Sequence, residues 1–253
     1  MTQGAINQAA MRLAQDGRPL SNHVLGLEQH LRQAAYVHHD DTGWRVGGEQ
    51  AWVGVYQSSN VVLFKVNPRH TAAELHAVLK DGFQGTLVCD RYSVYDAQQF
   101  AGMKQQKCLA HVLRNISDVV GQVKGRAGRG LVYLWRLKAN LQDALKVHRD
   151  FQEGKTTERQ FRFRGELVQG RVTRLLSRTD LRTPESERLR SGLWKQHEKG
   201  RLLRFLEDPV IPPTNNAAER RLRPAVIIRK VSQCSKNQRG AQAHMRTKSV
   251  VET

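Results

Sequence analysis

With 253 residues, 39% of them hydrophobic, the chain is long enough to bury the core of one large domain or of one domain with an insertion, and its composition excludes a disordered protein. Its formal charge of +18, from 41 Lys and Arg against 23 Asp and Glu, favours a polyanionic partner such as nucleic acid. No apolar run approaches the roughly 18 residues of a membrane span, and no secretory signal is visible, so we expect a cytoplasmic protein without membrane contacts. Three cysteines without paired spacing argue against a disulfide framework.

The first third of the chain predicts helix followed by sheet. Residues 1–34 have a helical, partly amphipathic pattern. Three β-rich runs follow, at residues 36–46, 51–56 and 61–66, and the glycines after residue 46 predict a hairpin between the first two. A helix is predicted from its N-cap Thr71, with Glu74 completing a capping box, to Gly82. Residues 85–90 form a short apolar run typical of a strand inside a sheet.

From Cys108 onwards the chain is predominantly helical. Apolar residues recur there at helical spacing, first from Leu109 to Val119 and again from Leu134 to Leu145. Thr183 followed by proline predicts a helix that starts at residue 184 and runs towards Phe205. Prolines between residues 209 and 213 then interrupt the chain before a last helix. The predicted order is β-β-β-α-β, a long helical stretch and a final helix.

Three acidic residues stand out by their context. Asp40 lies inside the first predicted strand, Asp90 ends the fourth, and Glu219 lies on the last helix. Carboxylates that converge from separate elements are what two-metal cleavage of a phosphodiester requires. The structural alternatives stay open, because Asp90 could cap a turn and Glu219 could complete a capping box that begins at Asn216.

Two other clusters suggest zinc, and neither is favoured. His38, His39, Asp40 and Asp41 are consecutive, and adjacent strand residues point to opposite faces, so the four side chains cannot converge. Cys108 and His111 have half of a zinc-site spacing without a second half. We predict a packed Cys108 and an exposed or hydrogen-bonding His111.

The order of the motifs is more specific than any one of them. The runs V-H-x-D-[DE]-T-G-W-R-V, Q-A-W-x-x-V, G-x-L-V-x-D-R-x-S-x-Y, K-C-L-A-H-x-x-R and P-P-T-N-N-x-A-E-R-x-L-R-P occur in this order from about Ala35 to the C-terminus. In this the chain resembles the transposases of the insertion sequence 66 family. The resemblance implies an α/β fold of the ribonuclease-H-like type, with a mixed sheet, flanking helices and an all-helical insertion before the last catalytic helix. We therefore expect an N-terminal helical segment over 1–34 and a catalytic core over 35–253, with the insertion at about 118–207.

The resemblance also implies a site and a reaction. It assigns a DDE triad to Asp40, Asp90 and Glu219, which would hold two Mg²⁺ ions, with Mn²⁺ as a possible substitute. The implied activity is DNA cleavage and strand transfer on double-stranded DNA, with accessory transposition proteins and self-association as further expectations. A non-catalytic nucleic-acid-binding remnant and a structure-specific nuclease of the same fold stay as alternatives. Compared with the family, the chain is expected to be truncated at both ends.

Basic residues gather after the predicted catalytic glutamate. From Glu219 onwards nine Lys and Arg face two acidic residues, and Arg220 and Arg223 share a helix face. The residues predicted to contact DNA are Arg220, Arg223, Arg229, Lys230, Lys236 and Arg239. The loop from Lys124 to Gly130 is a second candidate contact. The four tryptophans, at positions 44, 52, 135 and 194, are predicted to be core residues rather than base-stacking ones.

Overall fold

The computed structural model describes residues 3–80, 82–123, 128–179, 181, 183–232 and 235–253. Contacts between residues divide the chain into two compact units. The sheet unit comprises residues 1–87, 92–104 and 216–253, and the helical unit comprises residues 88–91 and 105–215. Residues 124–127 of the second candidate DNA-contacting loop lie outside the described residues.

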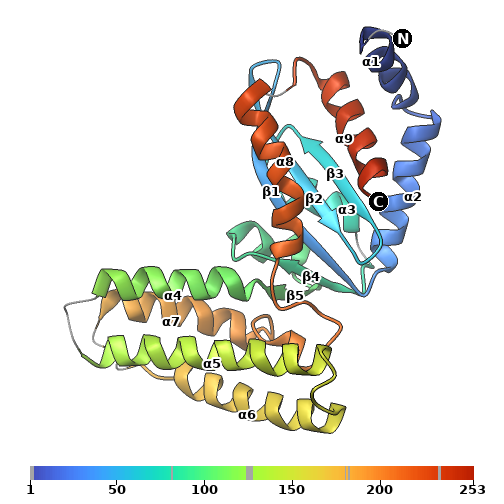
Figure 1. Ribbon diagram of the computed structural model, residues 1–253. Coiled ribbons are helices and arrows are strands. Elements are labelled where there is room, and N and C mark those ends of the chain that lie inside the picture. Colours follow the sequence, from blue (N-terminus) through green and yellow to red (C-terminus); the bar gives the residue numbers. More distant parts are fainter. Residues whose placement is uncertain (1–2, 81, 124–127, 180, 182, 233–234) are drawn as a thin grey trace. The chain divides into compact units, whose positions relative to one another are not determined.

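Five strands form one sheet in the order β3-β2-β1-β4-β5 (Figure 1). Their bounds are Tyr36–Val46 for β1, Glu49–Gln57 for β2, Val62–Asn67 for β3, Thr86–Cys89 for β4 and Lys104–Lys107 for β5. β1 pairs antiparallel with β2, and β2 pairs antiparallel with β3. This five-stranded sheet and its flanking helices confirm the predicted α/β fold class.

The β1–β2 hairpin turns on two glycines, as predicted. Gly47 and Gly48 have φ angles of 60° and 90°, which side chains other than glycine rarely adopt. Two consecutive residues with positive φ give the turn whose twist matches that of the flanking strands. This turn sets the register in which Asp40 lies opposite Val55 of β2.

The two faces of β1–β3 are covered by different helices (Figure 1). On one face lie α8 (Asn216–Ser232) and α9 (Gln238–Glu252), which share a core with the strands. The main members of that core are Trp44, Val53, Val55, Phe64, Ala218, Leu222, Ala225 and Met245. On the other face, Tyr56 donates its hydroxyl to the carbonyl of Leu75 in α3 (Ala72–Leu79) at 2.9 Å. The helices α1 (Gln3–Leu13) and α2 (Pro19–Gln33) pack against α9, and α2 also contacts β3.

Hydroxyl groups of α9 and of its C-cap residue Thr253 bind the backbone of β3, the strand at one end of the sheet order. The Phe64 N–H donates to Ser249 Oγ at 2.8 Å, and the Val62 N–H donates to Thr253 Oγ1 at 3.2 Å. The Thr253 hydroxyl also donates to the Val62 carbonyl at 3.1 Å. Backbone groups that an edge strand leaves open are therefore satisfied by side chains of this helix.

The helix predicted after Thr71 is confirmed at its start and differs at its end. Thr71 and Glu74 form the capping box that the sequence indicated. The helix ends at Leu79, before Gly82, because Lys80 already has a positive φ of 58° and interrupts the helical hydrogen bonds.

The helical unit consists mainly of α4 (Leu109–Val123), α5 (Arg129–Gln152), α6 (Glu158–Leu176) and α7 (Pro184–Glu198). α7 begins at Pro184 as predicted, although the Thr183 side chain makes no capping hydrogen bond. The prediction that it continues towards Phe205 was wrong, because Gly200 takes a positive φ of 64° and only a short 3₁₀ turn follows. Among the described residues, no helix has the length and apolar character needed to cross a membrane.

Candidate catalytic site

Asp40 lies on the face of the sheet that α8 covers. In an antiparallel sheet, residues directly opposite each other share a face, and Asp40 lies opposite Val55, which lies opposite Phe64. Val55 and Phe64 pack in one core with Ala218 of α8. Asp40 itself is half-buried. The sheet unit therefore directs this carboxylate towards the layer that contains Glu219.

Asp41 points to the opposite face and already has a partner. His70 Nε2 donates to Asp41 Oδ2 at 2.7 Å. The His70 ring is stacked between Trp52 and Tyr92, with ring centroids 5.4 and 4.9 Å away. Of the two adjacent aspartates, Asp40 is therefore the one whose side chain points to the side of the sheet that α8 covers.

Next to this stack, His39 is held as a neutral ring. It is almost fully buried, and its Nδ1 is hydrogen-bonded to the Tyr95 hydroxyl at 2.7 Å. Burial, with a smaller contribution from the charge of His70, lowers the pKa of His39 to about 3. Because His39 lies on the Asp41 face and His38 on the Asp40 face, the four consecutive residues do not converge, as the strand alternation predicted.

Asp90 follows β4 in the helical unit, within a cluster of charges. The neighbouring Cys89 is fully buried, and burial raises the pKa of its thiol to about 11, opposed by the positive charge of Lys107. The Lys107 side chain is itself fully buried and its Nζ donates to Cys89 Sγ at 3.4 Å. Burial lowers the pKa of Arg91, and the charge of Asp90 opposes that shift. Asp90 thus lies at the end of its strand, beside the half-buried Arg91 and next to a fully buried cysteine whose sulfur binds Lys107.

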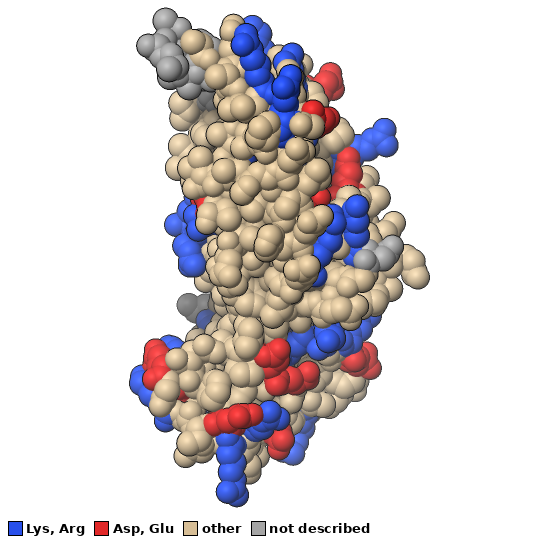
Figure 2. Space-filling model, turned by 90° about the vertical axis from the view of Figure 1, so that its right-hand side faces the viewer, with Lys and Arg blue, Asp and Glu red and all other residues tan. Residues whose placement is uncertain are grey.

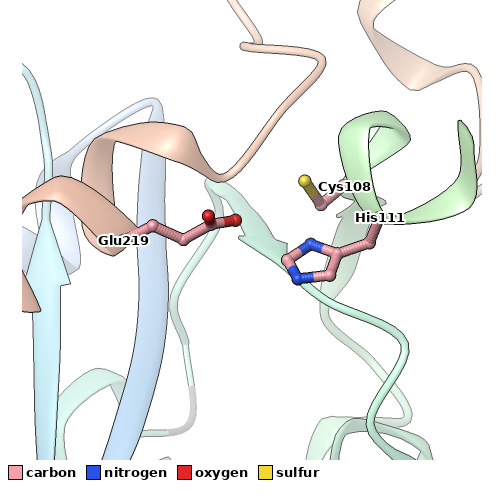
Figure 3. Close-up of side chains that lie close together, drawn as sticks. All are labelled: Cys108, His111 and Glu219. Carbon is pink, nitrogen blue, oxygen red and sulfur yellow. The ribbon is translucent and has the colours of Figure 1, made fainter. Parts of the chain in front are cut away.

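Cys108 and His111 lie one turn apart at the beginning of α4 (Figure 3). Cys108 is fully buried, and its Sγ accepts a hydrogen bond from the Asn215 N–H at 3.1 Å, which confirms that it is packed. The Leu109 N–H donates to the Pro213 carbonyl at 3.0 Å. The Cys108 sulfur and a ring nitrogen of His111 lie within 4.8 Å of each other. These contacts fix the segment immediately before α8 against the start of α4.

Glu219 lies in the first turn of α8 (Figure 3). The helix begins at Asn216, so Glu219 is its fourth residue. In a capping box with Asn216 as the N-cap, Glu219 would be the third residue of the helix. Ala218, Leu222 and Ala225 are buried and form the face that packs on the sheet. Glu219 follows Ala218 by one residue, about 100° around the helix, and is half-buried at the flank of that face.

The structure brings two of the three predicted carboxylates into one compact unit. Asp40 and Glu219 belong to the sheet unit, on elements that pack against each other. Asp90 belongs to the segment 88–91 of the helical unit. The convergence of all three stays a prediction.

Comparison with known families adds to these observations. The chain matches the family described as Transposase IS66 family over residues 2–243. The chain belongs to this family. The match begins at residue 2 and so includes α1 and α2, which the motifs after Ala35 do not cover.

Solved structures similar to this IS66-family transposase include the catalytic core domain of the HTLV-2 integrase in complex with magnesium, in a dimeric and a trimeric form. The identities are 12% and 14%, and the TM-score is 0.25 in both cases. The similarity covers 34% of this chain and 69% of the integrase chain. No curated protein matches the transposase.

Several residues around the candidate site were missed by sequence reasoning. The stacked rings of Trp52, His70 and Tyr92 come from three separate segments, and no spacing in the sequence connects them. Lys107 is a lysine in a polar run, which gave no signal for a buried strand residue. The pairing of Asp41 with His70 could not be predicted, since it depends on the backbone path after β3.

The positive charge of the transposase is shared by both units. The helical unit has 24 Lys and Arg against 13 Asp and Glu, and the sheet unit has 17 against 10. On the face drawn in Figure 2, acidic side chains lie among the basic ones, so this face carries no unbroken basic patch. A DNA contact through this face would therefore depend on individual exposed cations and not on the net charge alone.

The basic residues of α8, of α9 and of the segment between them are either exposed or bonded to neighbouring groups. Arg220, Arg223, Lys230, Lys236 and Arg239 are exposed. Arg229 Nη1 donates to Thr42 Oγ1 at 3.1 Å and to the Gly43 carbonyl at 2.8 Å, so part of this guanidinium binds β1. Arg221 forms an ion pair with Glu252 at 2.6 Å. A contact between DNA and the six predicted residues stays a prediction.

We expect the double variant Arg220→Gln, Arg223→Gln to bind duplex DNA with a weaker salt dependence. Each lost phosphate contact should reduce the slope of log K against log salt by about 0.9. The slope is measured by fluorescence anisotropy on two duplexes of unrelated sequence, and the variant should lose the same amount of affinity for both. Arg221→Gln is the matched control on the same helix, and it should leave the slope unchanged because Arg221 pairs with Glu252. A wild-type slope near zero would contradict a DNA-contacting surface on α8.

Proposed function

We propose that this IS66-family chain is the catalytic core of a DDE transposase, which cuts DNA strands and joins the freed 3′ ends to target DNA. The observation that carries the proposal is the arrangement of two adjacent aspartates on β1. Asp40 faces the α8 side of the sheet, where the core includes Ala218 beside Glu219, whereas Asp41 is bound by His70 on the other face. Family membership supports the same assignment.

The donor set fits magnesium. Asp40, Asp90 and Glu219 offer carboxylate oxygens, the ligands that Mg²⁺ prefers, and all three side chains are half-buried and so reachable from solvent. These residues would hold two Mg²⁺ ions, with Mn²⁺ as a substitute. The chemistry supplied by such a metal pair is Lewis-acid stabilisation of the attacking and leaving oxygens of an in-line phosphodiester displacement.

The residues of the chain itself would bind the metal ions and orient the DNA backbone. None of the three carboxylates is required to attack phosphorus, so no covalent enzyme intermediate forms. Glu219 lies in the first turn of α8, where the helix dipole favours a negative charge. The exposed Arg220 and Arg223 follow it on the same helix and would bind phosphates of the DNA backbone beside the cut. The buried contact between Leu222 and the sheet holds this helix in place.

The test is metal-dependent nicking of a supercoiled plasmid. The wild-type chain should nick in Mg²⁺ and lose the activity in excess chelator. Glu219→Gln should lower the nicking rate at least ~100-fold, because a lost metal ligand removes several kcal/mol of transition-state stabilisation. The control Glu49→Gln changes an exposed glutamate at the start of β2 and should nick like the wild type.

Three results would count against the proposal. Nicking that persists in chelator or in Glu219→Gln would place the activity elsewhere. Tight DNA binding without any nicking would favour a non-catalytic nucleic-acid-binding protein. Cleavage limited to branched or gapped DNA, without joining of ends, would favour a structure-specific nuclease.

A further inference from the structure

Helix α5 exposes a tryptophan, against the expectation from the sequence. Trp135 is 52% exposed, and so is Val132, one helical turn earlier. The buried stripe of the same helix is formed by Leu134, Leu137 and Leu141. Trp135 follows Leu134 by about 100° around the helix and therefore lies outside the core, whereas Trp44 is buried as predicted. The exposed tryptophan and valine together give this face of α5 an apolar, aromatic surface on which a planar partner can stack.

Cations flank the exposed indole. Lys138 Nζ lies 5.6 Å from the centroid of the Trp135 ring, in cation–π geometry. The same ammonium donates to Ser117 Oγ of α4 at 2.9 Å, which holds it between the two helices. Arg136 follows Trp135 in the sequence and is exposed. We name Val132, Trp135, Arg136 and Lys138 the Trp135 surface.

Charge decides which partner this surface fits. The described side chains of α4 and of the first half of α5 carry Arg114, Arg136 and Lys138 against one acid, Asp118. The helical unit as a whole has 24 Lys and Arg against 13 Asp and Glu. A second copy of the chain would bring the same positive charge and be repelled, whereas a nucleic-acid strand would be attracted.

We propose that the Trp135 surface binds a DNA strand at an unpaired nucleotide. The indole would stack on the exposed base, while Arg136 and Lys138 would contact the flanking phosphates. Aromatic rings beside cations suit this role because every base has a stacking face, whatever its sequence. The inference rests on the proposed function in taking DNA as the substrate, but it concerns binding by the helical unit and requires no catalytic residue.

The experiment measures DNA binding in chelator, where no cleavage occurs. The probes are a blunt fluorescein-labelled duplex and the same duplex with a single-stranded overhang. Trp135→Ala should weaken binding of the overhang probe about 10-fold and that of the blunt probe much less. Trp135→Phe should retain most of the affinity, because a phenyl ring still stacks. Phe163→Ala is the matched control, since Phe163 is a 62% exposed aromatic on α6 of the same unit, and it should bind both probes like the wild type.

Three outcomes would overturn the inference. These are unchanged overhang binding by Trp135→Ala, equal losses in Phe163→Ala, and a change of oligomeric state in Trp135→Ala with DNA binding intact, which would make the surface a protein interface. Thermal melting of each variant separates a folding defect from lost contact. If wild-type chain binds the overhang through Trp135 but nicks no plasmid, the catalytic proposal fails and this inference stands.

Discussion

Asp40→Asn is expected to abolish metal-dependent nicking, whereas Asp41→Asn, one residue further along β1, should leave most of it. Both substitutions replace an aspartate with an asparagine. They differ only in the face of the sheet on which the side chain lies. Asp40 faces the α8 layer and is a proposed metal ligand, so its loss should slow nicking at least ~100-fold. Plasmid nicking at several Mg²⁺ concentrations measures the difference.

Asp41→Asn should affect stability instead. It removes the charged acceptor of the His70 hydrogen bond, and we expect a cost of about 1–3 kcal/mol in the free energy of unfolding. Urea unfolding of both variants supplies this measurement. If Asp41→Asn abolished nicking while Asp40→Asn retained it, the assignment of the two aspartates to opposite roles would be wrong.

Leu222→Ala should destabilise the sheet unit by about 2–5 kcal/mol, the second large effect that we expect. Leu222 is 3% exposed and packs with Val53, Val55 and their neighbours, so its truncation leaves a cavity between α8 and the sheet. Glu219 lies on the same helix three residues earlier, and a looser α8 should also slow nicking under conditions where the variant is still folded.

Ile227→Ala is the matched control on the same helix. Ile227 is 61% exposed, so its truncation should change the free energy of unfolding by no more than about 0.5 kcal/mol. Urea unfolding gives both values, and an unchanged m-value shows that the denatured state is the same. Equal stability of the two variants would show that the contact between α8 and the sheet does not hold the helix.

The local pattern of the sequence predicted the elements that carry the candidate site. Alternation of side chains along β1 places Asp40 and Asp41 on opposite faces, and the glycines after Val46 fix the hairpin register. β5 had no such signal, because Gln105, Gln106 and Lys107 are polar yet fully buried. Their burial depends on distant partners: the Gln106 side-chain amide donates to the Leu202 carbonyl at 2.9 Å. Hydrophobic periodicity cannot report such a contact.

The same limit explains why Trp135 was wrongly predicted to be a core residue. The pattern of α5 indicates a helix, but not how wide its buried stripe is, and Trp135 falls just outside that stripe. Arg229 was predicted from charge alone, whereas its bond to the Gly43 carbonyl depends on the packing of α8 on β1. Spacing along a chain predicts which residues share a face, and only the packed structure shows what that face meets.

The hydroxyls that α9 places on β3 also bear on how this protein can aggregate. Uncovered edge strands recruit strands from other molecules and so begin intermolecular sheets. At Val62 and Phe64 the bonding positions that an incoming strand would need are already taken by Thr253 and Ser249. Edge-to-edge aggregation therefore first requires α9 to separate from β3. The local unfolding of this helix should then limit the rate of aggregation through this edge.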